Sequence, residues 1–254
     1  MRIAVAGKGG AGKTTISATL ARLGGRSGSS VVAIDADANP NLGIALGVAP
    51  ETASAVTAIP SALVSRRLGG AGLTEPVEQV LDRYAVPAPD GVRLLAMGAP
   101  AHAEEGCLCS AHAVVSAVIE DLGDEPRRLV VVDMEASPEH LSRGTIRHVD
   151  VVCLVAEPYY RSLETVRRMA ALAAELPVAI VVVANKVRSS DDTQAILEFC
   201  ARHELRFAGE VPWSDEVAAA DRSRTAVLDW PAAEAVTAAI AALRLELGVR
   251  SPSS

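Results

Sequence analysis

The stretch IAVAGKGGAGKTT, residues 3–15, decides the fold of this chain. Residues 3–6 are a short apolar run that predicts a buried strand, and residues 7–14 match the pattern G-x-x-x-x-G-K-[ST]. Apolar residues at helical spacing predict a helix over residues 14–23, which Gly24 and Gly25 would end. A glycine-rich turn between a strand and a helix turns backbone N–H groups and the positive end of the helix dipole toward a phosphate.

This loop predicts a site for the phosphates of ATP or ADP together with Mg²⁺. Lys13 would reach the β and γ oxygens, and the Thr14 hydroxyl would ligate the metal. Asp133 follows the apolar run 129–132 and would hold the same ion directly or through water. The nucleotide-binding candidates in the loop are Gly9, Gly10, Ala11, Gly12, Lys13, Thr14 and Thr15.

Outward from the loop, apolar strands alternate with amphipathic helices. Further strands are predicted at residues 31–34, 92–97, 129–132, 151–155, 178–184 and 207–211, and helices at 109–122, 160–176, 191–203 and 232–247. Residues 50–90 have no strong period and predict an irregular excursion with short helices. The alternation favours an α/β fold in one domain, residues 1–248, with a doubly wound, mostly parallel sheet, helices on both faces and a frayed tail at 249–254. Ligands of such sheets bind at the carboxyl ends of the strands.

Composition narrows the class of protein. Half of the 254 residues are hydrophobic and 22% are charged, so a large core can be buried, and with 3% aromatics it must be built from Ala, Val, Leu and Ile. A net charge of −7 argues against nucleic acid or an anionic membrane as a partner. No apolar run reaches the length of a membrane-spanning helix, and the first residues do not resemble a signal peptide. We therefore expect a cytoplasmic protein.

Basic residues are distributed unusually. Of the 24 basic residues only Lys8, Lys13 and Lys186 are lysine, and the rest are arginine. All three lysines lie in the predicted nucleotide motifs, which suggests that a compact ammonium is needed there and a planar guanidinium would not fit.

The pair Cys107 and Cys109 is the second chemical feature. Two thiolates spaced Cys-x-Cys can chelate one ion but cannot complete a tetrahedral four-sulfur site, whereas a two-fold dimer would supply four on its axis. Thiolates suit Zn²⁺, Cu⁺ or Ni²⁺, and the N-terminus of the helix that follows would favour the thiolate form. Core packing of both cysteines, or a disulfide between them, is the alternative. The other cysteines and nearby histidines are assigned to core packing (Cys153, Cys200) and to the surface (His102, His112).

The second lysine of the loop, Lys8, resembles the deviant Walker A motif of the MinD/ParA/nitrogenase-iron-protein class of ATPases. The resemblance implies a dimer that sandwiches two nucleotides, in which Lys8 of each chain reaches the phosphates held by the other. It also implies that Asp37 is a switch I aspartate that orients the attacking water, with Asp35 behind it. Asn185-Lys186 resembles the corner that reads the adenine base, and Pro212 the platform beside it.

Two longer segments resemble the CooC-type ATPases, maturation factors that insert nickel into carbon monoxide dehydrogenase. Residues 133–145, DMEASPEHLSRGT, resemble their switch II segment, D-M-E-A-G-x-E-H-L-x-R-G-T, and residues 35–42, DADANPNL, resemble their switch I. The Cys107/Cys109 pair matches their metal motif in spacing and order, and the likeness covers nearly the whole chain. Ser137 stands where the family has Gly, and Pro138 lacks an N–H donor, so this loop departs from the family in how it senses the γ-phosphate.

Together these features predict a homodimeric metallochaperone ATPase that binds nickel or zinc and serves a nickel enzyme, carbon monoxide dehydrogenase first among the candidates. A positioning ATPase of the ParA/MinD type, an iron–sulfur ATPase, and a factor for another nickel or zinc enzyme are the alternatives.

Overall fold

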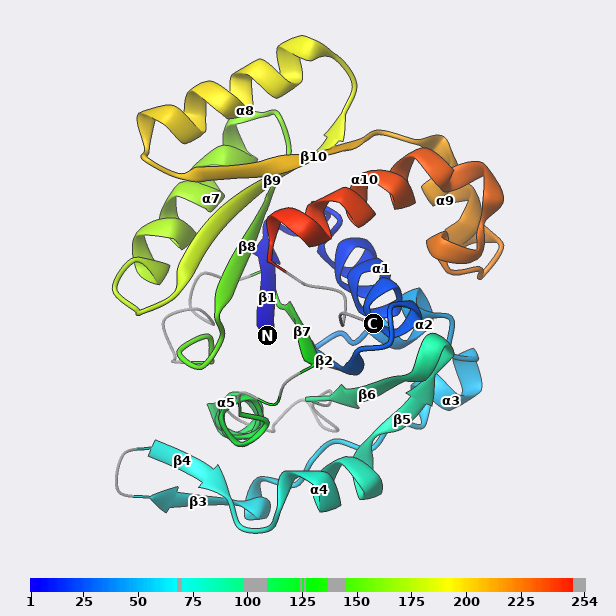
Figure 1. Ribbon diagram of the computed structural model, residues 1–254, viewed down its shortest axis with the longest axis vertical. Helices are drawn as coiled ribbons and strands as arrows, with labels where there is room; N and C mark the ends of the chain where they lie inside the picture. Colours follow the sequence, from blue (N-terminus) through cyan, green and yellow to red (C-terminus); the bar gives the residue numbers. More distant parts are fainter. Residues whose placement is uncertain (68–69, 98–108, 124, 126, 137–144, 249–254) are drawn as a thin grey trace.

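The computed structural model describes residues 1–67, 70–97, 109–123, 125, 127–136 and 145–248. An eight-stranded sheet in the order β10-β9-β8-β1-β7-β2-β6-β5 runs from top to bottom of Figure 1. Its strands are β1 (Arg2–Gly7), β2 (Ser30–Ala36), β5 (Val86–Ala88), β6 (Val92–Ala96), β7 (Arg128–Met134), β8 (Val151–Ala156), β9 (Ala179–Val187) and β10 (Arg206–Pro212). All neighbours pair parallel except β5 with β6. The predicted mostly parallel α/β fold is thus confirmed.

Helices cover both faces of this sheet. The longer helices are α1 (Lys13–Arg26), α4 (Val77–Tyr84), α5 (Cys109–Asp121), α7 (Tyr160–Ala173), α8 (Ser190–Arg202), α9 (Asp215–Arg222) and α10 (Glu234–Glu246). In Figure 1, α1 and α10 lie on one side of the strands and α5 and α7 on the other. None of the helices in the described ranges is long and apolar enough to cross a membrane.

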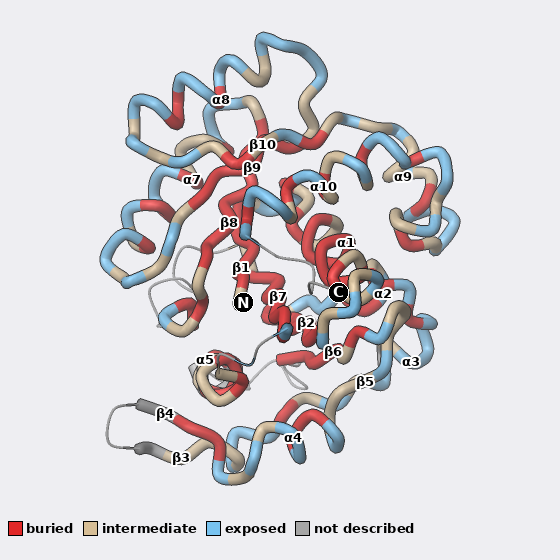
Figure 2. Tube along the Cα trace, in the orientation of Figure 1, coloured by how far each residue is buried: buried red, intermediate tan, exposed pale blue. Residues whose placement is uncertain are grey.

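Alternate residues of the central strands enter two separate apolar clusters. Val130 and Val132 of β7 pack with α5 and α7, whereas Leu129 and Val131 pack with α1 and α10. A strand that is covered on both faces must be apolar at nearly every position, which explains the uninterrupted valine runs. Figure 2 shows the result as a continuous buried spine through β8, β1, β7 and β2.

Residues 50–90 contain the short helices that the sequence predicts, and also strands that it does not. These helices are α3 (Pro50–Ser54), η1 (Ser61–Leu63), α4 and η2 (Pro89–Gly91). A further short helix, α2 (Leu42–Leu46), precedes the segment and is not predicted by the sequence. A small antiparallel ribbon, β3 (Val64–Arg67) with β4 (Gly70–Leu73), lies against α5, and β5 extends the main sheet. Helix α9 and the turns η3 (Val227–Asp229) and η4 (Pro231–Ala233) were likewise not predicted.

The predicted end of the first helix at Gly24-Gly25 is wrong, because α1 continues to Arg26. A Cβ atom on Gly24 would lie 2.5 Å from Leu129 Cδ2, and one on Gly25 would lie 2.0 Å from the carbonyl oxygen of Asp90. The two glycines therefore serve close packing of the helix rather than its termination.

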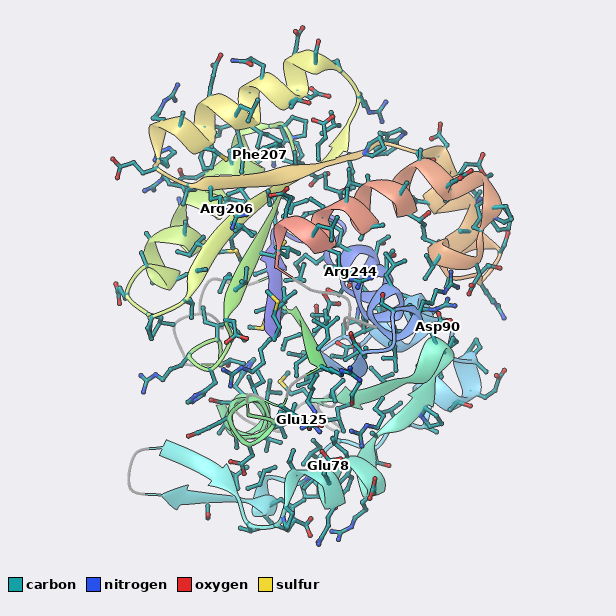
Figure 3. The ribbon with its side chains drawn as sticks, in the orientation of Figure 1. Glu78, Asp90, Glu125, Arg206, Phe207 and Arg244 are labelled. Carbon is teal, nitrogen blue, oxygen red and sulfur yellow. The ribbon has the colours of Figure 1, made fainter. Side chains whose placement is uncertain are left out.

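Charged residues fix the same end of α1. The Arg22 side chain is 4% exposed, and its Nε lies 2.6 Å from Asp90 Oδ2. Its two terminal nitrogens bind the carboxylate of Asp229 in η3. From the other side, Arg244 of α10 donates to the Leu23 carbonyl oxygen at 3.0 Å. Asp90 and Arg244 are labelled on either side of α1 in Figure 3. Ion pairs and a hydrogen bond thus attach α1, the helix that follows the phosphate loop, to η2, η3 and α10.

Candidate nucleotide site

The loop between β1 and α1 has the conformation that the glycine pattern predicts. Gly10 and Gly12 have φ angles of +80° and +95°, which disfavour residues with a side chain. A Cβ on Gly12 would lie 2.2 Å from Nδ2 of Asn185. Helix α1 begins at Lys13 without a side-chain cap, so its first N–H groups remain for a ligand at the loop.

Asp133 lies at the centre of the site. Thr14 Oγ1 donates to its Oδ2 at 2.7 Å, and Ser17 Oγ donates to its Oδ1 at 3.0 Å. Burial raises the pKa of Asp133 to about 6, although both hydroxyl donors and the Lys13 ammonium lower it. A buried carboxylate beside a hydroxyl supplies the hard oxygen donors that Mg²⁺ prefers, so these residues fit the metal.

Lys13 is buried next to this carboxylate. Its Nζ lies 3.5 Å from the carbonyl oxygen of Lys8. Desolvation lowers the pKa of Lys13, and the nearby carboxylates of Asp133, Asp37 and Glu135 partly offset that effect. Bringing a phosphate to this ammonium adds negative charge where burial has removed water, which favours the charged form of the lysine.

The two switch I carboxylates have different environments. Asp35 is 1% exposed, pairs in register with Asp133 on β7, and accepts hydrogen bonds from the backbone N–H groups of Leu42 at 2.8 Å and Asp37 at 3.2 Å. Burial raises the pKa of Asp35 to about 7. Asp37 is half-buried and caps the next turn through the N–H of Asn39 at 2.8 Å. Asp35 thus orders the loop that carries Asp37, and the role of Asp37 toward water stays a prediction.

The end of β9 contacts the phosphate loop. Asn185 Nδ2 donates to the Ala11 carbonyl oxygen at 2.6 Å, and Lys186 Nζ donates to that of Gly10 at 2.5 Å. Beside them a cavity of about 500 Å³ is lined by residues of the loop, α1, β10, α9 and α10. Thr15 and Pro212 line it, as does Trp213, which the sequence analysis missed. The cavity is large enough for a nucleobase, and the assignment of these residues to adenine stays a prediction.

Among the described residues, Lys8 contacts an aromatic ring rather than a carboxylate. Its Nζ lies 5.7 Å from the ring centroid of Tyr159 and 3.4 Å from the Gly9 carbonyl oxygen. The Tyr159 hydroxyl donates to Glu157 Oε2 at 2.7 Å, which raises the pKa of Tyr159 to about 12. The other oxygen, Glu157 Oε1, lies 2.9 Å from Lys186 Nζ.

Several predicted residues lie outside the part of the chain that the structure describes. They are His102, Cys107, Ser137 and Pro138, together with the side chain of Cys109, whose backbone begins α5. Within the described ranges, no group of three or more His, Cys, Asp and Glu side chains could hold a metal ion. Cys153 and Cys200 are buried, as predicted, but His112 is also buried, which corrects its assignment to the surface.

Ser17 and Glu157 are site residues that the sequence analysis missed. Ser17 lies one turn after Lys13 and Thr14 on the same helix, so its i+4 spacing from the motif lysine and i+3 spacing from Thr14 would have identified it. Glu157 directly follows β8, at the same edge of the sheet as the other candidates, so the strand-end rule used for Asp133 would have identified it.

Comparison with known proteins agrees with this geometry. Residues 3–227 match the model of the CobQ/CobB/MinD/ParA nucleotide-binding domain. The carbon monoxide dehydrogenase accessory protein CooC of Rhodospirillum rubrum is 37% identical over 238 residues, which cover 90% of each chain. An uncharacterized ATP-binding protein of Methanocaldococcus jannaschii is 34% identical over 232 residues, covering 85% of this chain and 87% of that protein.

Solved structures show the same fold at lower sequence identity. The MinD protein of Pyrococcus horikoshii, complexed with Mg-ADP, has a TM-score of 0.74 at 18% identity and covers 98% of this chain and 96% of its own. MinD of Aquifex aeolicus has a TM-score of 0.69 at 18% identity over the full length of both chains. The chain therefore belongs to the CobQ/CobB/MinD/ParA family of nucleotide-binding ATPases, in its CooC-type group.

Proposed function

We propose that this protein is an ATP-driven homodimeric metallochaperone that carries nickel, with zinc as a competing ion, to carbon monoxide dehydrogenase. The observation that carries the proposal is the pairing of a nucleotide site with a Cys-x-Cys motif in a chain 37% identical to CooC over 90% of its length. Thr14, Lys13 and Asp133 supply the site, and Cys107 and Cys109 of two chains supply the thiolates for the cargo ion.

Within the site, each side chain has a proposed task. Thr14 and Asp133 would hold Mg²⁺, which supplies charge neutralisation at the phosphates when bound. Lys13 binds the β and γ oxygens, and Lys8 of the partner subunit adds positive charge as the bond between the β–γ bridging oxygen and γ-phosphorus breaks. Asp37 orients the water whose oxygen attacks the γ-phosphorus, so that ATP and water give ADP and phosphate.

The arrangement of the helices supports coupling between the two sites. Helix α5 begins at Cys109 and packs through Val115 and Val118 into the same apolar cluster as Ile34 of β2 and Val132 of β7. These strands carry Asp35 and Asp133 near their carboxyl ends. A change at the nucleotide could therefore reach the helix that positions the cysteines through one packed layer.

Linkage makes the coupling measurable. If ATP closes the dimer and thereby assembles four thiolates, ATP tightens metal binding and metal tightens dimerisation by the same factor. We expect nickel titration with a non-hydrolysable ATP analogue to give one ion per two chains, bound at least ten-fold more tightly than without it. Equal metal affinity in both states would exclude the coupling.

Cysteine variants test the proposed metal site. The double substitution Cys107→Ser, Cys109→Ser should abolish stoichiometric nickel binding and leave nucleotide binding intact. Cys200→Ala is the matched control, because that thiol is buried in the core and its pKa is raised by burial to about 11. Metal uptake by the double variant at the wild-type stoichiometry would refute the assignment.

The client is tested by transfer. Nickel-loaded wild-type protein with ATP should restore activity to nickel-free carbon monoxide dehydrogenase, and the non-hydrolysable analogue should not. If nickel passes to the enzyme equally well without ATP hydrolysis, the proposed role of the ATPase cycle is wrong.

A further inference from the structure

The end of β9 deviates from regular strand geometry at Lys186. The pairing of β9 with β10 passes from Asn185↔Val211 directly to Val187↔Pro212, so Lys186 is the extra residue of a bulge. Its φ angle is +60°, a left-handed conformation that is strained for a residue with a side chain. Bulges next to functional sites re-aim a side chain, and such strain persists only where the surroundings hold it.

The re-aimed side chain reaches the phosphate loop. Lys186 Nζ lies 2.5 Å from the Gly10 carbonyl oxygen and 2.9 Å from Glu157 Oε1. Gly10 itself has a φ of +80°, and a Cβ there would have nothing within 4 Å, so packing does little to hold this part of the loop. The lysine therefore links the exposed turn at Gly10 to a carboxylate at the end of β8.

Hydrogen bonds and an ion pair fix the position of Glu157. Its side chain is 10% exposed, its backbone N–H donates to Ser162 Oγ in the first turn of α7 at 2.9 Å, and its second oxygen accepts from the Tyr159 hydroxyl at 2.7 Å. A carboxylate fixed in this way keeps the flexible lysine in one orientation, because a buried charge is favourable only with its partner close by.

We propose that Glu157 and Lys186 form a strut that holds the phosphate loop at Gly10 in its nucleotide-binding shape. Glu157 is then a positioning residue: it acts on the nucleotide through Lys186 and the loop. Lys186, expected from the sequence to read the base, would contribute chiefly by fixing the Gly10 carbonyl. This inference rests on the nucleotide-binding part of the proposed function and is independent of the cysteines.

The direction in which Glu157→Gln changes nucleotide affinity distinguishes the strut from a simple charge effect. Removing the negative charge of Glu157 from the edge of an anion site should tighten nucleotide binding if the residue acts only through its field. If the carboxylate positions Lys186, Glu157→Gln should instead weaken it. Lys186→Met weakens binding under either view, and the double variant restores the net charge of the wild-type protein.

The test measures the dissociation constant of an ATP analogue with Mg²⁺ by calorimetry on the full chain. The strut predicts that the dissociation constant rises roughly ten-fold in E157Q and by a similar factor in K186M. The double variant should show no larger rise than either single variant, because both substitutions remove the same interaction. Tighter binding by E157Q with wild-type affinity in the double variant would overturn the proposal, as would a double variant whose loss is the product of the single losses.

Two further variants secure the interpretation. E164Q is the matched control, because it removes the same charge in the nearby helix α7, where Glu164 pairs with Arg167 and Arg168, and it should bind as the wild type does. Tyr159→Phe removes the hydroxyl that donates to Glu157 without changing any charge, so the strut can be tested even if E157Q does not fold. The strut predicts that this variant binds the ATP analogue two- to three-fold more weakly, and unchanged binding would count against the proposal. Absence of nucleotide binding by both wild type and E164Q would instead refute the proposed function.

Discussion

Replacement of Gly12 by alanine tests the geometry of the phosphate loop. The backbone at Gly12 has a φ of +95°, which costs alanine about 1–2 kcal/mol. The new Cβ would also lie 2.2 Å from Asn185 Nδ2, so Asn185 must move and lose its 2.6 Å hydrogen bond to the Ala11 carbonyl, worth about 1 kcal/mol. The free energy of unfolding should therefore fall by roughly 3 kcal/mol.

Gly10→Ala is the matched control for this prediction. Gly10 has a similar φ of +80°, but nothing lies within 4 Å of its Cβ position, so G10A carries the backbone cost alone. In a chain of this size we expect the melting temperature of nucleotide-free protein to fall by roughly 3 °C in G10A and roughly 6 °C in G12A.

A double-mutant cycle completes the test. In an Asn185→Ala background the nearest atoms to the Gly12 Cβ position are gone, so G12A should cost no more there than G10A does in the wild type. Scanning calorimetry of the four proteins of the cycle and of G10A measures each of these costs. If G12A and G10A melted at the same temperature, or if the cost of G12A were unchanged without Asn185, the reasoning would be refuted.

Three other predictions follow from the same structure. Asp133 has a pKa of about 6 in the folded chain, against an ordinary value of 3.8. The folded chain therefore holds the extra proton between these values and loses stability as the pH rises through that window. In the absence of metal and nucleotide, Asp133→Asn should melt higher than the wild type at pH 8 and equally near pH 3, and a lower melting temperature at pH 8 would contradict this. Arg22→Met should lower the free energy of unfolding by about 3 kcal/mol, because it leaves Asp90 and Asp229 without their buried partner. Arg26→Met changes a side chain that is 44% exposed and should lower it by less than about 1 kcal/mol. Equal losses in urea unfolding would show that burial does not decide the effect. Trp213 lines the cavity, so Trp213→Phe should remove the change in tryptophan fluorescence on nucleotide binding, while Trp230→Phe, at an indole that donates to Glu216, should retain it.

Hydrophobic patterning predicts the central architecture because a two-sided parallel sheet leaves little choice of residue. The valine runs of β7, β8 and β9 are buried on both faces, and each was identified within a few residues of its bounds. Hydrophobic periodicity does not predict short strands whose packing partners are remote in the sequence. The ribbon of β3 and β4 packs on α5, and β5 pairs with β6, but neither contact leaves a periodic pattern in residues 64–88.

Glycine shows a second limit of local patterns. Gly24-Gly25 reads locally as the end of a helix, yet the pair lies inside α1 because Leu129 and the Asp90 backbone approach too closely for any side chain. At Gly12 the motif predicts a turn, and the φ angle of +95° agrees with it, while its role in nucleotide binding stays a prediction. A glycine thus indicates either a special φ angle or a close approach, and only the structure tells which.

The scarcity of lysine has a structural basis in the loop. The three ammonium groups lie within 3.5 Å of three successive carbonyl oxygens: Lys13 with that of Lys8, Lys8 with that of Gly9, and Lys186 with that of Gly10. A guanidinium has five donors in a rigid plane and would leave several of them unpaired at a single carbonyl oxygen, whereas an ammonium can turn its donors toward one oxygen and then toward a phosphate. Arginine serves elsewhere, as at Arg22, where two carboxylates meet its planar fork. The choice between the two basic residues in this chain therefore follows the shape of the acceptor, and Lys186→Arg should weaken nucleotide binding although it keeps the charge; wild-type affinity in calorimetric titration would show that charge alone is required.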